Sequence, residues 1–353
     1  MNLYSFQTAK RIVVGRGAVD SLPDHLASFE GVKHVYIVAQ RAIQRSGKLE
    51  KIIENLRVAG IQAEWNTEVE PEPTEDNIRH VYNQVPRDRC DLLIGMGGGS
   101  VLDATKLIAV MLTNDQSLAD MTGIGRIGNP GVPTALIPTT AGTGSEVTPN
   151  AIVTFPEQQL KIGIVSPYLL PELVVLDPLL TLTVPKPVTA ATGMDAFTHA
   201  LESFISNKAN PISDMLALES MRLISANLVR AYQDGADLDA REAMLIGSMY
   251  GGMALSSAGT AAVHALAYPI GGQFHVTHGV ANSMLLPHVM RFNQDAIQKK
   301  LRQVALVMNL GDGVDSDNQA AERVLQQLEH WTEVLNIPQN LAAFGVEERH
   351  VPE

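Results

Sequence analysis

Residues Asp91 to Met111 read DLLIGMGGGSVLDATKLIAVM, and this stretch decides the class of fold. It begins with a short apolar run, continues through four glycines within five positions, and ends in a helical pattern that Ser100 opens. A strand that turns through glycine directly into a helix is typical of an α/β domain around a parallel sheet. Because glycine has no Cβ, backbone N–H groups there can approach a phosphate, which the N-terminus of the next helix also attracts.

The glycine-rich turn alone is a weak indication of a ligand. It departs from the dinucleotide fingerprint because no second strand ends in an acid about 20 residues further on. A tight turn from strand to helix, without a ligand, is the alternative explanation of the glycine-rich motif. A second loop, Pro138 to Glu146 (PTTAGTGSE), follows the next apolar run, and parallel strands place such loops at one edge of the sheet. Two neighbouring loops rich in glycine and hydroxyl groups therefore predict a phosphate-bearing cofactor at that edge.

The two halves of the chain differ in pattern. Up to about residue 180, apolar runs alternate with amphipathic stretches, which predicts strands alternating with helices. The predicted strands are His34 to Val38, Asp91 to Gly95, Val132 to Ile137 and Leu173 to Leu176, with a hairpin of Ala151 to Phe155 and Lys161 to Val165. From Ala190 to about Val334, helical periods replace them. We therefore predict an α/β domain over residues 1–183 and an all-helical domain over residues 184–353.

Two helices show the 3.6-residue apolar period most clearly. One is Gly47 to Ala59 in the first half. The other is Ser213 to Tyr232, which Asn210-Pro211 starts. Its predicted apolar face contains Met215, Leu218, Met221, Leu223 and Leu228.

Composition excludes several classes of protein. The 353 residues contain 26 Lys and Arg against 38 Asp and Glu, and the net charge of −12 argues against binding nucleic acid or an anionic membrane. No stretch of 18 or more uncharged apolar residues is present, and Lys10 and Arg11 interrupt the region a signal peptide would need, so we expect a cytoplasmic protein. The single Cys90 excludes a disulfide framework and a CxxC metal site. Any metal must therefore be held by histidines and carboxylates.

Asp195 and His199 are the first candidate metal ligands. They stand four residues apart, which places them one turn apart on one helix face. A surface ion pair is the common alternative for such spacing. The surrounding residues are apolar, however, so we expect the pair to be buried, where a charge needs a partner or a metal.

A cluster of histidines supplies the second indication of a metal. Four of the ten histidines lie between His264 and His288. His275 and His278 follow Gly271-Gly272, where we expect the helix to break so that the chain folds back towards His264. A hydrogen-bonded core role explains any single histidine better. Together, one carboxylate and up to three imidazoles suit Fe(II) or Zn(II) rather than calcium or magnesium, which prefer oxygen ligands.

Four ordered motifs spread over nearly the whole chain resemble the metal-dependent, iron-containing (group III) alcohol dehydrogenases. They are GGGS at Gly97 to Ser100 followed by Asp103, PTTAGTGSE at Pro138 to Glu146, ATGMDAFTHALE at Ala191 to Glu202, and VHALAYPIGGQFHVTHGVAN at Val263 to Asn282. The resemblance implies a Rossmann-like N-terminal domain and an all-α C-terminal domain, the architecture shared with dehydroquinate synthase, with cofactor and metal meeting between them. We also expect a homo-oligomer, a dimer or larger.

The resemblance implies roles for individual residues. Those that match the family's metal ligands are Asp195, His199, His264 and His278. Those that match its cofactor site are Gly97, Gly98, Gly99, Ser100, Asp103, Thr139, Thr140, Thr143 and Lys161, with Gln40 after the first cofactor strand. Asn150 falls where the family's substrate pocket begins. Ser145 and Glu146 are expected to shape their loop rather than to react.

Three departures from the family pattern limit the transfer of roles, and the first, Ala9 in place of a proline three positions after Phe6, is expected to change little. Tyr268 stands where many members have a second histidine near the proton path, and an unperturbed phenol keeps its proton until about pH 10, so His275 is the possible substitute as proton relay. Gln40, with Arg41 beside it, replaces the acid that hydrogen-bonds the ribose, which leaves NADP as possible as NAD. The chain also ends soon after Phe344, so we expect that the family's last helical segment is missing.

The function expected from these features is reversible oxidation of a short-chain alcohol to an aldehyde or ketone, with NAD or NADP and with Fe(II) or Zn(II). A dehydrogenase for hydroxy acids or other functionalised alcohols is the alternative within the family. A dehydroquinate synthase-type lyase is a more distant alternative, because the metal motifs lack the Lys and Arg residues an anionic substrate needs. A non-catalytic nucleotide-binding protein is the remaining alternative, and the complete ligand set argues against it.

Overall fold

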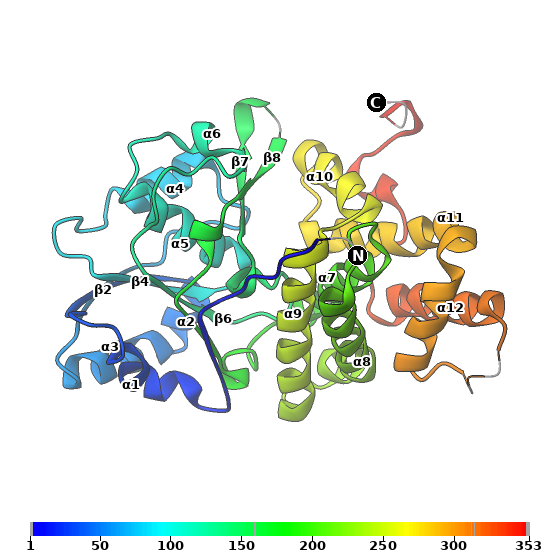
Figure 1. Ribbon diagram of the computed structural model, residues 1–353, viewed down its shortest axis with the longest axis horizontal. Helices are drawn as coiled ribbons and strands as arrows, with labels where there is room; N and C mark the ends of the chain where they lie inside the picture. The colour runs from blue at the N-terminus through cyan, green and yellow to red at the C-terminus, as the bar shows by residue number, and fades with distance from the viewer. Residues whose placement is uncertain (1–2, 159, 312, 314, 351–353) are drawn as a thin grey trace. The chain divides into compact units, whose positions relative to one another are not determined.

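The computed structural model describes residues 3–158, 160–311, 313 and 315–350, and the chain divides into two compact units. The α/β unit comprises Gln7–Thr140 and Ser145–Leu182. The helical unit comprises Met1–Phe6, Ala141–Gly144 and Thr183–Glu353. The short segment Ala141–Gly144, in the middle of the second glycine-rich loop, therefore belongs to the helical unit, which the sequence pattern did not predict. Figure 1 shows the elements of both units by colour along the chain.

A six-stranded parallel sheet forms the centre of the α/β unit. In order across the sheet, its strands are β1 (Arg11–Val14), β9 (Leu173–Leu176), β6 (Thr134–Pro138), β4 (Leu92–Gly97), β2 (His34–Ala39) and β3 (Gln62–Asn66). The register pairs Ala39 with Met96 and Gly97 with Pro138. The carboxyl ends of β2, β4 and β6 therefore lie at one edge of the sheet, as predicted for the two glycine-rich loops.

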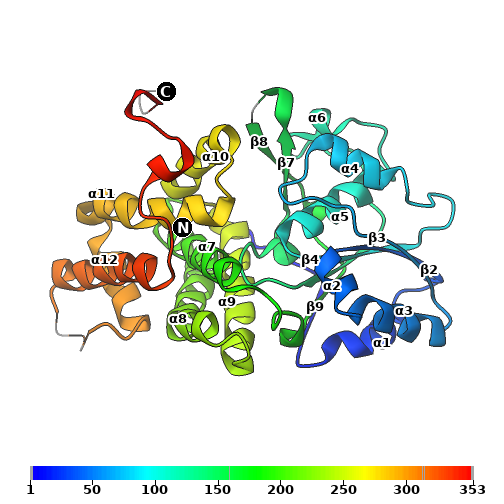
Figure 2. The ribbon, with the colours of Figure 1, turned by 180° about the vertical axis from the view of Figure 1, so that it is seen from behind.

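Helices cover both faces of this sheet (Figure 2). On one face, Val35 and Ile37 pack in a core with residues of α1 (Leu22–Leu26) and α3 (Lys48–Val58). On the other, Tyr36 and Val38 pack with α4 (Glu75–Tyr82) and α5 (Gly99–Met111). Burial on both faces explains why these strands read as continuous apolar runs. The remaining elements are α2 (Arg41–Arg45), α6 (Leu118–Met121), η1 (Ala18–Ser21), η2 (Ser145–Val147), η3 (Pro156–Gln158), η4 (Pro167–Leu169) and η5 (Pro178–Leu180).

The predicted hairpin is present as β7 (Asn150–Phe155) and β8 (Leu160–Val165), which pair antiparallel. The short β5 (Gly123–Ile124) adds to β8 in parallel and completes a separate three-stranded sheet. Thr154 of β7 also forms an isolated bridge with Thr74, the residue that caps α4. This bridge connects the hairpin to the N-terminus of α4.

The helical unit contains six long helices in its described part. They are α7 (Lys186–Ile205), α8 (Pro211–Gln233), α9 (Leu238–Ala258), α10 (Ala262–Phe274), α11 (His278–Val307) and α12 (Asp317–Val334), followed by η6 (Leu341–Phe344) and η7 (Glu348–His350). Asn210 caps α8 as its position before Pro211 predicted. In the core, Phe197 of α7 meets Trp331 of α12 edge to face, with ring centroids 5.0 Å apart. Among the described residues, we find no helix that combines the length and the hydropathy of a membrane-spanning segment.

The structure corrects three details of the sequence analysis. The helix with His264 does not break at Gly271-Gly272: α10 continues to Phe274 and ends at His275, whose backbone is left-handed with φ 55°. Met215 is not on the buried face of α8, since 64% of it is exposed. Strands β1, β3 and β5 were not predicted, because each is short and its residues are mostly exposed or only partly buried.

Candidate functional site

Helix α7 carries a row of buried polar side chains. Asp195, His199 and Glu202 are spaced by four and three residues, so they lie along one face of the helix. Their exposed fractions are 2%, 5% and 0%. The sequence prediction that the Asp195 and His199 pair is buried is confirmed. A buried row of this kind requires partners from other elements.

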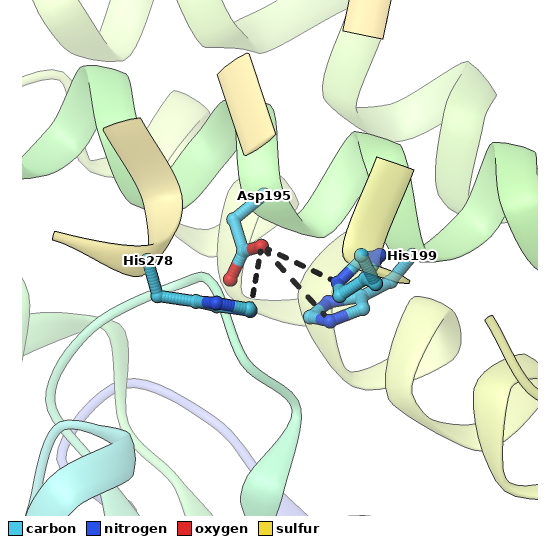
Figure 3. A group of neighbouring side chains, drawn as sticks. Asp195, His199 and His278 are labelled. Atoms are coloured by element: carbon cyan, nitrogen blue, oxygen red, sulfur yellow. Dashed lines mark ion pairs between the residues drawn. The ribbon is translucent and has the colours of Figure 1, made fainter. Parts of the chain in front are cut away.

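Two other helices bring imidazoles to Asp195. His264 lies in the first turn of α10, and His278 is the first residue of α11. The Oδ1 atom of Asp195 lies 4.0 Å from Nε2 of His199, 3.8 Å from Nε2 of His264 and 3.7 Å from Nε2 of His278. One ligand atom from each of the four residues lies within 4.8 Å of every other. Figure 3 shows the labelled His199 and His278 on either side of the Asp195 carboxylate, with dashed lines for the ion pairs.

The pKa values of Asp195 and His264 are shifted towards the protonation states that bind a metal. Burial by itself would raise the pKa of Asp195, but the imidazoles of His199, His278 and His264 outweigh that effect and hold the pKa below its ordinary value. Burial, together with the neighbouring imidazoles, lowers the pKa of His264 well below its usual value. The group therefore contains an ionised carboxylate and a neutral imidazole at His264, the forms that bind a metal.

Two residues that the sequence analysis did not single out contact this group. The carboxylate of Glu202 accepts a hydrogen bond from Nδ1 of His264 at 2.7 Å. The amide Nδ2 of Asn282 donates to Oδ1 of Asp195 at 2.7 Å and lies 3.1 Å from Nε2 of both His264 and His278. Glu202 could have been found from its position three residues after His199 on the same face. Asn282 stands four residues after His278, which is the same kind of signal.

The two candidates for proton relay differ in their surroundings. The ring of Tyr268 stacks on that of His278, with centroids 5.6 Å apart. His275 is exposed at the end of α10 and is not one of the four residues whose ligand atoms gather around Asp195. Tyr268 therefore lies beside the metal-ligating group, and His275 lies in the turn that connects α10 to α11.

In the α/β unit, the loops after three adjacent strands are joined by hydrogen bonds. The Oγ1 atom of Thr139, after β6, donates to Oε1 of Gln40, after β2, at 3.2 Å. The N–H group of Thr139 donates to the carbonyl of Gly97 in β4 at 3.0 Å. Because β2 and β4 lie at the point where the strand order reverses, this edge is the position where open α/β sheets bind ligands.

Close packing requires glycine in the turn between β4 and α5. Helix α5 begins at Gly99, one residue earlier than predicted, and Gly98 is its N-cap. A Cβ at Gly97 would lie 2.7 Å from Cβ of Val101, so only glycine fits there. A Cβ at Gly98 would lie 3.3 Å from Oγ1 of Thr140, so the backbone of this turn is tightly enclosed. Ser100, in the first turn of α5, accepts a hydrogen bond from the N–H group of Glu72 at 3.0 Å.

A buried lysine anchors the second loop to α5. The Nζ atom of Lys106 donates to the carbonyls of Ser145 at 2.9 Å and Thr148 at 3.4 Å, and also to that of Asn150. Asp103 lies 3.2 Å from Nζ of Lys106 and accepts from Oγ of Ser145 at 2.5 Å. Asp103 and Lys106 thus connect the helix after the glycine-rich turn to the loop in which Asn150 begins β7.

Burial shifts the protonation of this loop. Lys106 is fully enclosed, and burial lowers its pKa while Asp103 and Glu146 oppose that change. Burial raises the pKa of Glu146 to about 7, and its Oε1 atom lies buried without a hydrogen-bond partner among the described residues. Ser145 and Glu146 are both buried, and their expected role in shaping the loop stays a prediction.

The two remaining residues expected at the cofactor lie in different units. Lys161 of β8 has a side chain that is 6% exposed, and its Nζ atom forms an ion pair with Glu72 at 2.8 Å. Thr143 belongs to the segment Ala141–Gly144 of the helical unit. Within that unit the segment packs closely on α7 and α9, since a Cβ at Gly142 would lie 2.6 Å from Cβ of Thr192 and one at Gly144 would lie 2.6 Å from Cα of Gly252.

Comparison with known proteins covers both units. Residues 9–178 match the family model "Iron-containing alcohol dehydrogenase", and residues 189–353 match "Fe-containing alcohol dehydrogenase family, C-terminal". The chain is 39% identical over 338 residues to long-chain-alcohol dehydrogenase 1 of Geobacillus thermodenitrificans, covering 95% of this chain and 85% of the relative.

Solved structures give the same result. A crystal structure of a 1,3-propanediol oxidoreductase superposes with a TM-score of 0.95 at 36% identity and covers 99% of this chain and 92% of its own. The structure of sulfoacetaldehyde reductase from Bifidobacterium kashiwanohense in complex with NAD+ has a TM-score of 0.89 at 26% identity and covers 100% and 91%. The predicted fold class, an α/β domain followed by a helical domain, is confirmed.

Proposed function

The chain belongs to the iron-containing alcohol dehydrogenase family and is an oxidoreductase that acts on CH–OH groups, and we propose that it interconverts a short-chain alcohol and its aldehyde or ketone with a nicotinamide cofactor. The observation that carries this proposal is the gathering of three Nε2 atoms around Oδ1 of Asp195. The family assignment favours this function over the lyase and the non-catalytic alternatives.

We propose that Asp195, His199, His264 and His278 hold a divalent ion, Fe(II) or Zn(II). The donor set fits such an ion, because one carboxylate and three imidazoles are ligands that both metals accept. Two donors at about 2.1 Å from one ion can lie at most about 4.2 Å apart, and the 3.7–4.0 Å distances from Oδ1 of Asp195 to the three Nε2 atoms fall within that limit. The chemistry that the ion supplies when bound is polarisation of the alcohol or carbonyl oxygen.

We propose that the edge formed by the loops after β2, β4 and β6 binds the cofactor, whose nicotinamide supplies hydride transfer. Gly98, Gly99 and Ser100 offer the N-terminus of α5 to the pyrophosphate. The other proposed contacts are Gly97, Thr139, Thr140, Thr143, Lys161, Gln40 and Asp103. Gln40 carries no charge and accepts from Thr139, so it imposes no repulsion on a 2′-phosphate. We therefore propose that NADP is accepted as well as NAD.

The substrate and the proton path are further parts of the proposal. A short-chain alcohol agrees with the relative named for 1,3-propanediol, whereas another relative is named for long-chain alcohols. Asn150 is proposed as a substrate residue and Tyr268 as a side chain beside the reacting oxygen, since its ring stacks on His278. We propose that His275 carries the proton to solvent, because it is exposed and an imidazole can both accept and donate a proton. A functionalised alcohol such as a hydroxy acid remains the alternative substrate.

The proposed assembly is a homo-oligomer and the proposed location is the cytoplasm.

One activity screen tests the proposal. The purified enzyme is stripped with a chelator, reloaded in turn with Fe(II), Zn(II) and Mn(II), and assayed with NAD and NADP on short alcohols, aldehydes and hydroxy acids by nicotinamide absorbance. We expect activity to depend on the metal and to be lost in Asp195→Ala together with metal content, while circular dichroism shows an intact fold. Full turnover by the stripped enzyme or by Asp195→Ala would refute the metal role.

A further inference from the structure

We propose that Glu202 is a positioning residue that fixes the imidazole of His264 so that Nε2, and not Nδ1, faces the metal-ligating group. The inference rests on the proposed function of that group. Glu202 is outside the four ligating residues, and its carboxylate points to the opposite side of the His264 ring from Asp195: Nδ1 of His264 lies 2.7 Å from Oε2 of Glu202, and Nε2 lies 3.8 Å from Oδ1 of Asp195.

The tautomer of His264 follows from these contacts. A neutral imidazole carries one proton, and the nitrogen without it is the one that can bind a metal. A carboxylate accepts hydrogen bonds and does not donate them, so Glu202 requires the proton on Nδ1. Both side chains are enclosed, with exposed fractions of 1% for His264 and 0% for Glu202, so water does not replace either partner. The lone pair of His264 is thereby directed towards Asp195.

The same carboxylate also fixes the backbone on which His264 stands. It accepts the N–H groups of Ala261 at 2.9 Å, Val263 at 2.6 Å and His264 at 3.4 Å. Helix α10 has no side-chain cap of its own at Ala261, so a side chain from α7 satisfies its first donors. A negative charge at a helix N-terminus is favourable. Burial raises the pKa of Glu202, and these three backbone donors oppose that rise.

Glu202 thus links ligands on two helices. Asp195 and His199 stand on α7 together with Glu202, whereas His264 stands on α10. The Nδ1 atom of His199, by contrast, lies buried without a hydrogen-bond partner in the described part of the chain. Glu202 therefore acts on one imidazole of the set. Loss of such an outer carboxylate typically weakens metal binding by about 10- to 100-fold.

The test is a measurement of metal affinity, independent of turnover. Zn(II) and Fe(II) dissociation constants are determined by chelator competition for the wild type, Glu202→Gln, His264→Ala and the double variant. We expect Glu202→Gln to weaken binding by about 10- to 100-fold in the wild-type background and by less than about twofold when His264 is already absent, since the two residues act as one unit. The control is Glu219→Gln on α8, a partly exposed carboxylate paired with Arg222, and it should leave the affinity unchanged.

Two results would overturn the inference: an unchanged affinity in Glu202→Gln, or the same loss with and without His264. Failure of the proposed function looks different, because His264→Ala would then bind metal as well as the wild type does. Thermal unfolding of the stripped proteins checks the fold. If Glu202→Gln does not fold, Glu202→Asp is used, which keeps the charge but draws it back by one methylene. A weaker affinity in that variant supports the positioning role, and an unchanged one refutes it.

Discussion

Replacing Lys106 by methionine removes the charge that anchors the second loop of the α/β unit, and the loss should be large. Its Nζ atom is the hydrogen-bond donor to three backbone carbonyls and the ion-pair partner of Asp103. Methionine fills a similar volume but donates nothing. Asp103 keeps two donors, the hydroxyl of Ser145 and the N–H group of Ile152, so it is not left entirely unpaired.

Removing one partner of a buried ion pair costs about 3–5 kcal/mol. At about 2–4 °C per kcal/mol for a unit of this size, the unfolding temperature of the α/β unit should fall by about 6–20 °C. Denaturant unfolding and calorimetry measure the change. Lys51→Met is the matched control, because its ion pair with Asp20 is exposed and should contribute at most about 1 kcal/mol. A loss below about 1 kcal/mol in Lys106→Met, equal to the control, would refute the anchoring argument.

Three further outcomes follow from the buried polar groups and the tight turn. The pKa of Glu146 rises from 4.5 to about 7 on burial, so the folded protein holds this proton more tightly than the unfolded chain does. The free energy of unfolding should therefore fall as pH increases from about 4.5 to about 7. Glu146→Gln should flatten this part of the profile of stability against pH, and an unchanged slope would contradict the assignment. Gly97→Ala would place its Cβ 2.7 Å from Cβ of Val101 and should lower the free energy of unfolding, measured with denaturant, by about 1–3 kcal/mol. The control is Gly60→Ala, whose Cβ meets no neighbouring atom. Gly60 has a positive φ, so this variant should lose about 1 kcal/mol through the backbone alone. Asn282→Leu removes the amide that donates to buried Asp195 and should cost about 1.5–3 kcal/mol in the chelator-treated protein; no change in its unfolding midpoint would show that this hydrogen bond is not formed.

The parts of the fold that the sequence predicts are those in which burial leaves a local pattern. Strand β2 is buried on both faces, so its residues His34–Ala39 read as an apolar run. Strand β3 lies at the edge of the sheet, and its residues Gln62–Asn66 alternate without an apolar face, so no local signal identifies it. The glycine pair at 271–272 was a misleading signal, because α10 continues through it: a Cβ-free residue permits a break but does not require one.

The site divides in the same way. Asp195 and His199 are neighbours on one helix, so their spacing predicts their proximity, and the resemblance to a family supplied the rest of the ligating group. The contacts of Glu202 and Asn282 join residues 62 and 87 positions apart along the chain. Such contacts depend on how α7, α10 and α11 pack. A single sequence gives the residue types but not the packing that pairs them.

The row of side chains on α7 also constrains how this protein can change in length. An insertion of one residue between Asp195 and Glu202 would rotate everything after it by about 100° around the helix axis. Glu202 would then leave the N-terminus of α10, and His199 would turn away from Asp195 if the insertion preceded it. Insertions and deletions compatible with function must therefore fall outside this segment, for example in the exposed turn around Asn207 and Lys208 after α7. A library of single-residue insertions across α7 would map this boundary directly.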